Sequence, residues 1–231
     1  MTRKELASMI DHTFLSPAGE SDAVEKLCRE VAEYGFACAM VNPAEVANAA
    51  KVLAGSGKRV GTVINFPLGQ SSREAILAEV DCVREFGVKD IDFVIDIRKL
   101  KRAAKDKSKR EDLANDLECY VSRSKKFPGN RDDVVTKLII ECCYLTREEK
   151  ILACELAKAA DFDFVKTSTG FGSGGATIED VKLMRETVGA EMGVKAAGGI
   201  RTLEEAIAMI SAGANRIGTS SGVKIIESIK N

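Results

Sequence analysis

Two lysines stand at the ends of apolar runs that predict buried strands, and these are the residues best placed to do chemistry. Lys166 follows Phe162-Asp-Phe-Val, and Lys195 follows Gly193-Val. A free lysine amine, with a pKa near 10.4, is neutral in only roughly one molecule in 2,500 at pH 7, whereas a desolvated amine is a nucleophile. A single such lysine favours packing of the stem with the amine in water. Two of them favour chemistry.

An aspartate in a third apolar run is the acidic candidate. Alternation along residues 90–96 places Asp90, Asp92 and Asp96 on one strand face. We interpret Asp90 as a solvent-exposed strand start and Asp96 as part of the following loop, which leaves Asp92 facing inward to pair with a lysine. A metal site is the alternative, and two nearby ammonium groups would compete with the ion.

Three clusters of glycine and hydroxyl residues follow predicted strands and precede predicted helices. They are Gly170-Phe-Gly-Ser-Gly-Gly175, Gly198-Gly-Ile-Arg-Thr202 and Gly218-Thr-Ser-Ser-Gly222. The first matches the dinucleotide pattern G-x-G-x-x-G, but no acidic residue ends the next strand, which argues against a nicotinamide-dependent oxidoreductase. Free backbone amides and helix N-termini favour an anion, so the three clusters together predict a phosphate site.

The elements that must position these residues alternate between strand and helix. Boxes of the type Ser/Thr-x-x-Glu at residues 2, 71, 146 and 202 predict helix starts. Strands are expected over 9–15, 36–41, 59–66, 90–97, 136–143, 162–168, around Lys195 and over 215–220; helices are expected near the N-terminus, over 21–34, 44–54, 72–86, 147–160, 177–188 and 203–212, and at the C-terminal end.

Alternation of this kind calls for parallel strands with right-handed crossovers. A (β/α)₈ TIM barrel, an α/β fold spanning residues 1–231 as a single domain, is the economical closure of eight such strands, and an open doubly wound sheet is the alternative. The barrel is favoured because Asp11, Asp92, Lys166 and Lys195 all lie near strand ends. Only a barrel mouth gathers so many strand ends around one point.

Composition restricts the possible partners. A formal net charge of -1 provides no overall field for nucleic acid or an anionic membrane. The basic run 98–110 is followed by acids and lacks interleaved aromatics, so a solvated helix start or loop is favoured over a nucleic-acid surface.

The N-terminal residues lack the apolar core of a signal peptide and no apolar run reaches spanning length, so we expect a cytoplasmic protein. The seven cysteines are expected to be core thiols, and the one histidine, His12, has no nucleophile motif to pair with.

The sequence resembles the deoxyribose-phosphate aldolase family almost from end to end. The segments that carry the resemblance are Ile10-Asp-His-Thr13, Val41-Asn-Pro43, Asn65-Phe-Pro-Leu-Gly69, Ile91-Asp-Phe-Val94, Leu138-Ile-Ile-Glu141, Phe164-Val-Lys-Thr-Ser-Thr-Gly170 and Gly193-Val-Lys-Ala-Ala-Gly-Gly-Ile-Arg-Thr202. The resemblance implies a class I aldolase on a TIM barrel, which cleaves the phosphosugar 2-deoxy-D-ribose 5-phosphate reversibly into acetaldehyde and D-glyceraldehyde 3-phosphate. It implies no metal and no organic cofactor. Another lysine-imine barrel, such as a thiazole synthase, is the remaining alternative.

The resemblance also implies residue roles. Lys166 would form the Schiff base, Lys195 and Asp92 the proton relay, and Asp11 would support them. The substrate's phosphate would be held around Thr169, Gly170, Gly198, Gly199, Arg201, Gly218, Ser220 and Ser221. One like charge at about 4 Å supplies roughly 4 kcal/mol at an effective dielectric near 20, so Lys195 alone would suffice to lower the Lys166 pKa to about 7.5.

The chain departs from the family pattern at three places. Met40 replaces a usual cysteine, Asp96 replaces a usual asparagine, and the segment between Asp96 and Lys137 is longer than usual. The first two changes could alter the polarity of the mouth, whereas the third concerns a surface helix or loop. The oligomeric state is left open, with a dimer or tetramer of identical chains among the possibilities.

Overall fold

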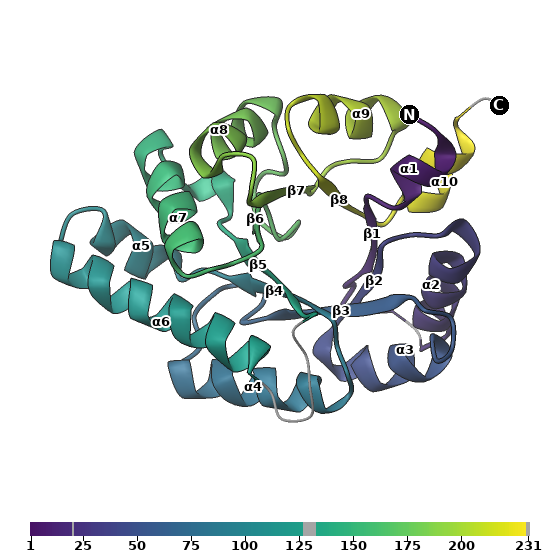
Figure 1. The fold of residues 1–231 in the computed structure, drawn as a ribbon, viewed down its shortest axis with the longest axis horizontal. Helices are drawn as coiled ribbons and strands as arrows, with labels where there is room; N and C mark the ends of the chain where they lie inside the picture. Colours follow the sequence, from purple (N-terminus) through teal and green to yellow (C-terminus); the bar gives the residue numbers. More distant parts are fainter. Residues whose placement is uncertain (20, 127–132, 230–231) are drawn as a thin grey trace.

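The computed structural model describes residues 1–19, 21–126 and 133–229. Eight parallel strands close into one barrel in chain order, so that β1 pairs with both β2 and β8. Figure 1 shows this ring of strands inside a layer of helices. The strands are β1 Ile10–Phe14, β2 Cys38–Val41, β3 Arg59–Ile64, β4 Asp90–Val94, β5 Val135–Ile139, β6 Phe164–Lys166, β7 Gly193–Ala197 and β8 Arg216–Thr219. The predicted TIM barrel is confirmed, and the doubly wound sheet is excluded.

Helices connect the strands on the outside of the barrel (Figure 1). They are α1 Arg3–Ala7, α2 Ser21–Tyr34, η1 Pro43–Glu45, α3 Val46–Val52, α4 Arg73–Glu85, α5 Ile97–Ala103, α6 Lys107–Lys125, η2 Cys142–Tyr144, α7 Arg147–Ala159, α8 Ile178–Val188, α9 Leu203–Ser211 and α10 Gly222–Glu227. Complete capping boxes at Thr2, Thr146 and Thr202 confirm the predicted starts of α1, α7 and α9. The box expected at residue 71 is wrong, because Ser72 caps α4 by accepting a hydrogen bond from the Ala75 amide.

The long polar segment after β4 forms two helices, α5 and α6, of which α6 packs beside α4 (Figure 1). The basic run 98–110 is therefore mostly helical, and its lysines and arginines lie largely on the surface. Residues 127–132, the last part of this segment, lie outside the described residues. No described helix is long and apolar enough to cross a membrane.

Alternation along each strand separates two environments. Residues such as Ile10, Ile91 and Val165 face outward and form the main apolar core with the helices. Their neighbours along the strands face the barrel interior, and among these are buried charged residues. The main apolar layer of the barrel therefore lies between strands and helices, and the interior holds ionic groups together with a small apolar cluster that includes Met40 and Val63.

Candidate active site

The two predicted lysines lie side by side on adjacent strands. In the register of β6 and β7, Lys166 is paired directly with Lys195. Lys166 is the last residue of its strand, whereas two further residues follow Lys195 before β7 ends, so Lys195 does not end its strand as predicted. Both amines contact the same oxygen of Asp92: Lys166 Nζ lies 2.9 Å and Lys195 Nζ 2.7 Å from Oδ2. The structure thus brings together the three residues predicted from sequence.

The Lys166 amine has an unusually low pKa. Burial is the largest contribution and lowers the pKa, Asp92 opposes it, and the positive charges of Lys195 and Lys137 lower it further, to about 8. Burial therefore lowers the Lys166 pKa more than the charge of Lys195 does, although that charge alone was expected to suffice. At pH 7 such an amine is neutral in roughly one molecule in ten.

A third lysine, Lys137 on β5, completes the buried charge network and was missed in the sequence. Its Nζ lies 2.6 Å from Asp90 Oδ1 and 3.0 Å from Asp92 Oδ1. Burial would lower the pKa of Lys137, but the carboxylates of Asp90, Asp92 and Asp11 raise it well above its ordinary value. The signal was available, because Lys137 directly precedes the apolar run Leu138-Ile-Ile140, just as Lys166 ends one.

Asp11 on β1 anchors the opposite side of the network. Its carboxylate lies 2.6 Å from Lys195 Nζ and 2.8 Å from Nη1 of Arg216, the first residue of β8. Burial alone would raise the pKa of Asp11 and of Asp92, yet the surrounding cations outweigh it and hold both pKa values below their ordinary range. Both carboxylates are therefore ionised near neutral pH.

The interpretation of Asp90 as a solvent-exposed strand start is wrong. Its side chain is fully buried, and it pairs with Lys137 on one oxygen and with Arg59 Nε, at 2.5 Å, on the other. The two inward carboxylates of β4, Asp90 and Asp92, lie near Asp11 of β1, and cations from β3, β5 and β8 meet the three of them. Asp96 does lie beyond the strand, as expected, and caps α5.

One group of described residues has donor types that suit a metal ion, namely Asp11, Cys38 and Asp90. The Lys137 ammonium already lies 2.6 Å from Asp90 and 3.8 Å from Asp11. A divalent cation there would face this ammonium at close range and gain less from the carboxylates. The geometry therefore suits an ion-pair network better than a metal centre.

A cavity of about 390 Å³ opens above the network at the carboxyl ends of the strands. Lys166 lines it, whereas Lys195, Asp92 and Asp11 lie beneath its surface. Most of the predicted phosphate residues also line it: Thr169, Gly170, Gly198, Gly199, Arg201, Gly218 and Ser220. Gly170, Gly198 and Gly199 have φ values of 87°, 90° and 83°, a backbone conformation that glycine adopts without strain. The cavity therefore places a nucleophilic amine beside loops suited to an anion.

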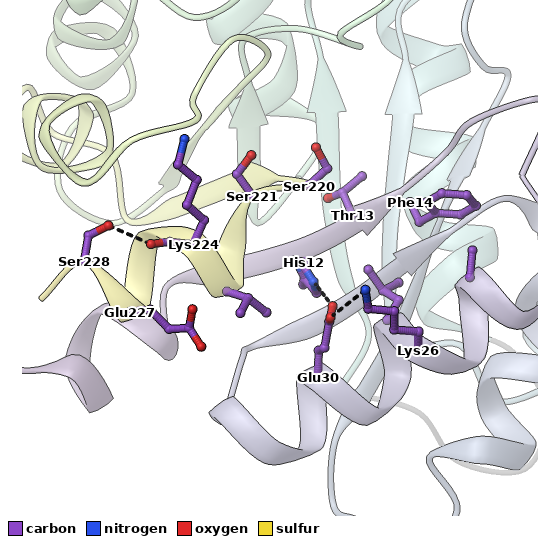
Figure 2. Close-up of a pocket in the computed structure, with 13 residues that line it drawn as sticks. His12, Thr13, Phe14, Lys26, Glu30, Ser220, Ser221, Lys224, Glu227 and Ser228 are labelled. Carbon is purple, nitrogen blue, oxygen red and sulfur yellow. Dashed lines mark hydrogen bonds and ion pairs between the residues drawn. The ribbon is translucent and has the colours of Figure 1, made fainter.

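Ser221 does not line this cavity. It lines a larger pocket, of about 740 Å³, on the outer wall between α2 and α10. Figure 2 shows His12 in this pocket directed toward Glu30, whose Oε2 lies 2.7 Å from His12 Nε2. The pocket shares Thr13, Phe14 and Ser220 with the Lys166 cavity, but none of the buried lysines line it. His12 is buried and pairs with the partly exposed Glu30, in line with its lack of a nucleophile partner.

Comparisons with known proteins agree with this geometry. A model of DeoC/LacD family aldolases matches residues 6–228. A deoxyribose-phosphate aldolase from Bacteroides thetaiotaomicron is 50% identical over 98% of this chain and 91% of its own length. One from Thermococcus gammatolerans is 50% identical over 100% of this chain and 99% of its own. The solved structure of the deoxyribose phosphate aldolase from Aeropyrum pernix, described as a unique tetrameric structure, is 33% identical in sequence with a TM-score of 0.88. The match covers 98% of this chain and 92% of that one.

Proposed function

This chain belongs to the DeoC/LacD family of aldolases, and from that membership we propose that it carries out the reaction of its relatives, the reversible cleavage of 2-deoxy-D-ribose 5-phosphate. The products are acetaldehyde and D-glyceraldehyde 3-phosphate. The observation that carries the proposal is the Lys166 amine, which has a pKa of about 8, shares one Asp92 oxygen with Lys195 and lines a cavity rich in glycine loops.

In the proposed mechanism, the neutral Lys166 amine attacks C1 of the open-chain sugar. Loss of water gives a protonated imine, which accepts the electron pair released when the C2–C3 bond breaks. A lysine buried beside two other ammonium groups loses its proton more readily than one in water. The low pKa of Lys166 therefore favours the attack on C1, and the positive charge of the imine favours cleavage of the C2–C3 bond.

Asp92 and Lys195 are the proposed proton relay. The C3 hydroxyl proton leaves as the C2–C3 bond breaks, and the relay takes it, through water where the distance requires. A proton returned to C2 of the enamine gives the imine of acetaldehyde, and hydrolysis then frees acetaldehyde and Lys166. Asp11 supports the relay because its contact of 2.6 Å fixes the Lys195 ammonium.

The glycine loops are proposed to hold the 5-phosphate of the substrate. Backbone amides near Gly170, Gly198 and Gly199, with Ser220 and the exposed Arg201, supply donors and charge on one side of the cavity. This remote binding would position C1 near Lys166. Unphosphorylated 2-deoxyribose should therefore react much more slowly, and equal rates for the two sugars would remove this part of the proposal.

Trapping of the imine tests the assignment of the nucleophile. Borohydride reduction in the presence of acetaldehyde should leave an ethyl group on Lys166, which peptide mass spectrometry locates. An adduct on Lys195 or Lys137 would refute the assignment, and so would the absence of any adduct.

Since the proposal includes no metal or organic cofactor, cleavage activity should also survive exhaustive chelation. A loss of activity that only a divalent ion restores would point to a metal-dependent aldolase.

Three further proposals concern the assembly, the location and the partners of the enzyme. We propose that the chain assembles into a homo-oligomer, since the Aeropyrum pernix relative of the same fold is described as a tetramer; sedimentation of the purified protein tests this. We also propose that it works in the cytoplasm, without nucleic acid as a partner, where phosphosugars are available; cell fractionation and retention on DNA at varied salt test these two points.

A further inference from the structure

Glu141, two residues after the end of β5, has an unusual backbone and a buried side chain. Its φ and ψ are 53° and 64°, in the left-handed region that non-glycine residues rarely adopt. The residue is only 3% exposed. Strained residues of this kind persist where the surrounding structure holds them and are frequent at functional sites.

The Glu141 carboxylate binds a single turn of the chain, the one that follows Lys166. Its oxygens accept hydrogen bonds from the Thr169 amide at 3.2 and 3.3 Å, and Oε2 also accepts one from the Thr169 hydroxyl. The Thr169 hydroxyl oxygen in turn accepts a hydrogen bond from the Phe171 amide at 3.0 Å. Among the described residues no lysine, arginine or histidine forms an ion pair with Glu141.

The loop beyond this turn passes close to the same carboxylate. A Cβ atom added to Gly172 would lie 3.2 Å from Cδ of Glu141, so the glycine permits the close approach. Thr169, Gly170 and Phe171 all line the cavity that contains Lys166. The Lys166 amine pairs with Asp92, and the Lys166 carbonyl accepts a hydrogen bond from the amide of Ile140, the residue before Glu141, at 3.0 Å. The Glu141 carboxylate thus fixes one wall of the cavity through Thr169, whereas Asp92 holds the nucleophilic amine.

We propose that Glu141 is a positioning residue that sets the preference for phosphorylated substrate. Its carboxylate holds the turn Thr169–Phe171 in the conformation that presents the Gly170 backbone to the anion. The inference rests on the proposed aldolase function and adds a residue to it. Loss of the carboxylate should raise KM for the phosphosugar and leave imine formation at Lys166 unchanged.

The test compares two variants by kcat/KM for 2-deoxyribose 5-phosphate and for 2-deoxyribose. In Glu141→Gly the backbone conformation becomes unstrained but the carboxylate is gone, so the ratio of the two constants should fall about tenfold or more, through KM, with little change in Tm. In Glu141→Gln one side-chain oxygen can still accept from both Thr169 donors, so the ratio should stay within about threefold of wild type. The pH profile of borohydride trapping should stay unchanged in both.

Asp161→Gly is the matched control, because Asp161 also has a positive φ, of 63°, but lies in the turn before β6 with an exposed side chain. It should leave the ratio unchanged. An unaltered ratio in Glu141→Gly, or a trapping profile that shifts with it, overturns the inference. Should Glu141→Gly not fold, Thr169→Val against Thr169→Ser decides, since both keep the backbone amide but only serine keeps the hydroxyl that donates to Glu141; equal ratios for these two reject the proposal. Absence of cleavage by the wild type would instead reject the aldolase function itself.

Discussion

Lys166 and Lys195 share one oxygen of Asp92, but they differ in the number of carboxylates that they meet. Lys195 also contacts Asp11, and Lys137 contacts Asp90 and Asp92, whereas Lys166 pairs with Asp92 alone. A buried ammonium with fewer anionic partners is the easiest to deprotonate. The neutral state therefore falls on the lysine that lines the cavity.

Replacement of Lys195 should move the pH dependence of imine formation. The Lys195 charge lowers the Lys166 pKa, so in Lys195→Leu that pKa rises toward the ordinary value near 10.5. Only the neutral amine attacks, so the pH at which borohydride trapping reaches half its maximum should shift upward from about 8. Lys224→Leu, at an exposed lysine, is the control and should leave the midpoint in place. An unmoved midpoint in Lys195→Leu would show that the charge of Lys195 does not set the Lys166 pKa.

Removal of Lys137 should destabilise the whole barrel. Lys137→Met leaves the buried carboxylates of Asp90 and Asp92 without their shared cation, a change that typically costs about 3–5 kcal/mol. Urea unfolding should show the loss in the free energy of unfolding. Lys125→Met, which removes ion pairs with the more exposed Asp161 and Asp163, should cost about 1 kcal/mol or less. Similar losses in the two variants would contradict a special role for the buried network.

The sequence predicted part of this network and missed the rest for a physical reason. Lys166, Lys195, Asp92 and Asp11 drew attention because each was expected near a strand end, where the active sites of barrels lie, although in the structure only Lys166 ends its strand. Lys137 and Arg216 carry no such local signal, because their roles depend on which carboxylates the neighbouring strands bring. The local sequence pattern does not show which residues meet across neighbouring strands. For the same reason Asp90 was wrongly expected at a solvent-exposed strand start.

At the level of elements, the alternation of strand and helix was predictable, but several ends were not. β5 stops at Ile139 rather than at residue 143, because Glu141 takes a left-handed conformation that no apolar run reveals. β6 spans only Phe164–Lys166, since the following residues turn into the cavity wall. The helix α5 was not predicted as a separate element, because most of it falls within the charge run 98–110. The many basic residues there obscure the helical spacing of the buried Leu100 and Ala103.

The start of α5 explains one departure from the family pattern. Asp96 Oδ1 accepts hydrogen bonds from the amides of Arg98 at 2.8 Å and Lys99 at 3.0 Å, so Asp96 is the N-cap of α5. Asparagine caps a helix about as well as aspartate. Asp96→Asn should therefore leave thermal stability and cleavage rate close to wild type, whereas Asp96→Ala should lower the free energy of unfolding by about 1 kcal/mol. A marked loss of activity in Asp96→Asn would instead give the Asp96 charge a part in the reaction.

At the scale of the whole molecule, the barrel interior must hold large ionic side chains in a small space. Phe164 lies between two of them, with its ring centroid 6.0 Å from Lys137 Nζ and 5.5 Å from the Arg216 guanidinium. Gly193 makes room for that ring, because a Cβ there would lie 2.2 Å from it. Small residues on the strands thus compensate for the long charged ones.

The same compensation on the other side of the barrel involves Met40, a second departure from the family pattern. Met40 is buried in a small apolar cluster with Leu15, Cys38 and Val63. A Cβ added to Gly61 on β3 would lie 2.3 Å from Met40 Sδ and 2.9 Å from the Asp90 Cβ. The longer side chain of Met40 is accommodated because the adjacent strand carries a glycine at the paired position.

Gly61→Ala should therefore overfill the barrel interior and lower the free energy of unfolding by about 1–3 kcal/mol. The Met40 side chain can move, but the Asp90 Cβ is bonded directly to the strand backbone and cannot yield without shifting the partner of Lys137. The double variant Gly61→Ala/Met40→Val removes the sulfur from the crowded space and should recover part of the loss in urea unfolding, while Met40→Val alone should cost less than Gly61→Ala. If the double variant loses as much stability as the sum of the two single changes, Met40 and Gly61 are not coupled. The need for glycine at position 61 would then come from Cys38 and Asp90 alone.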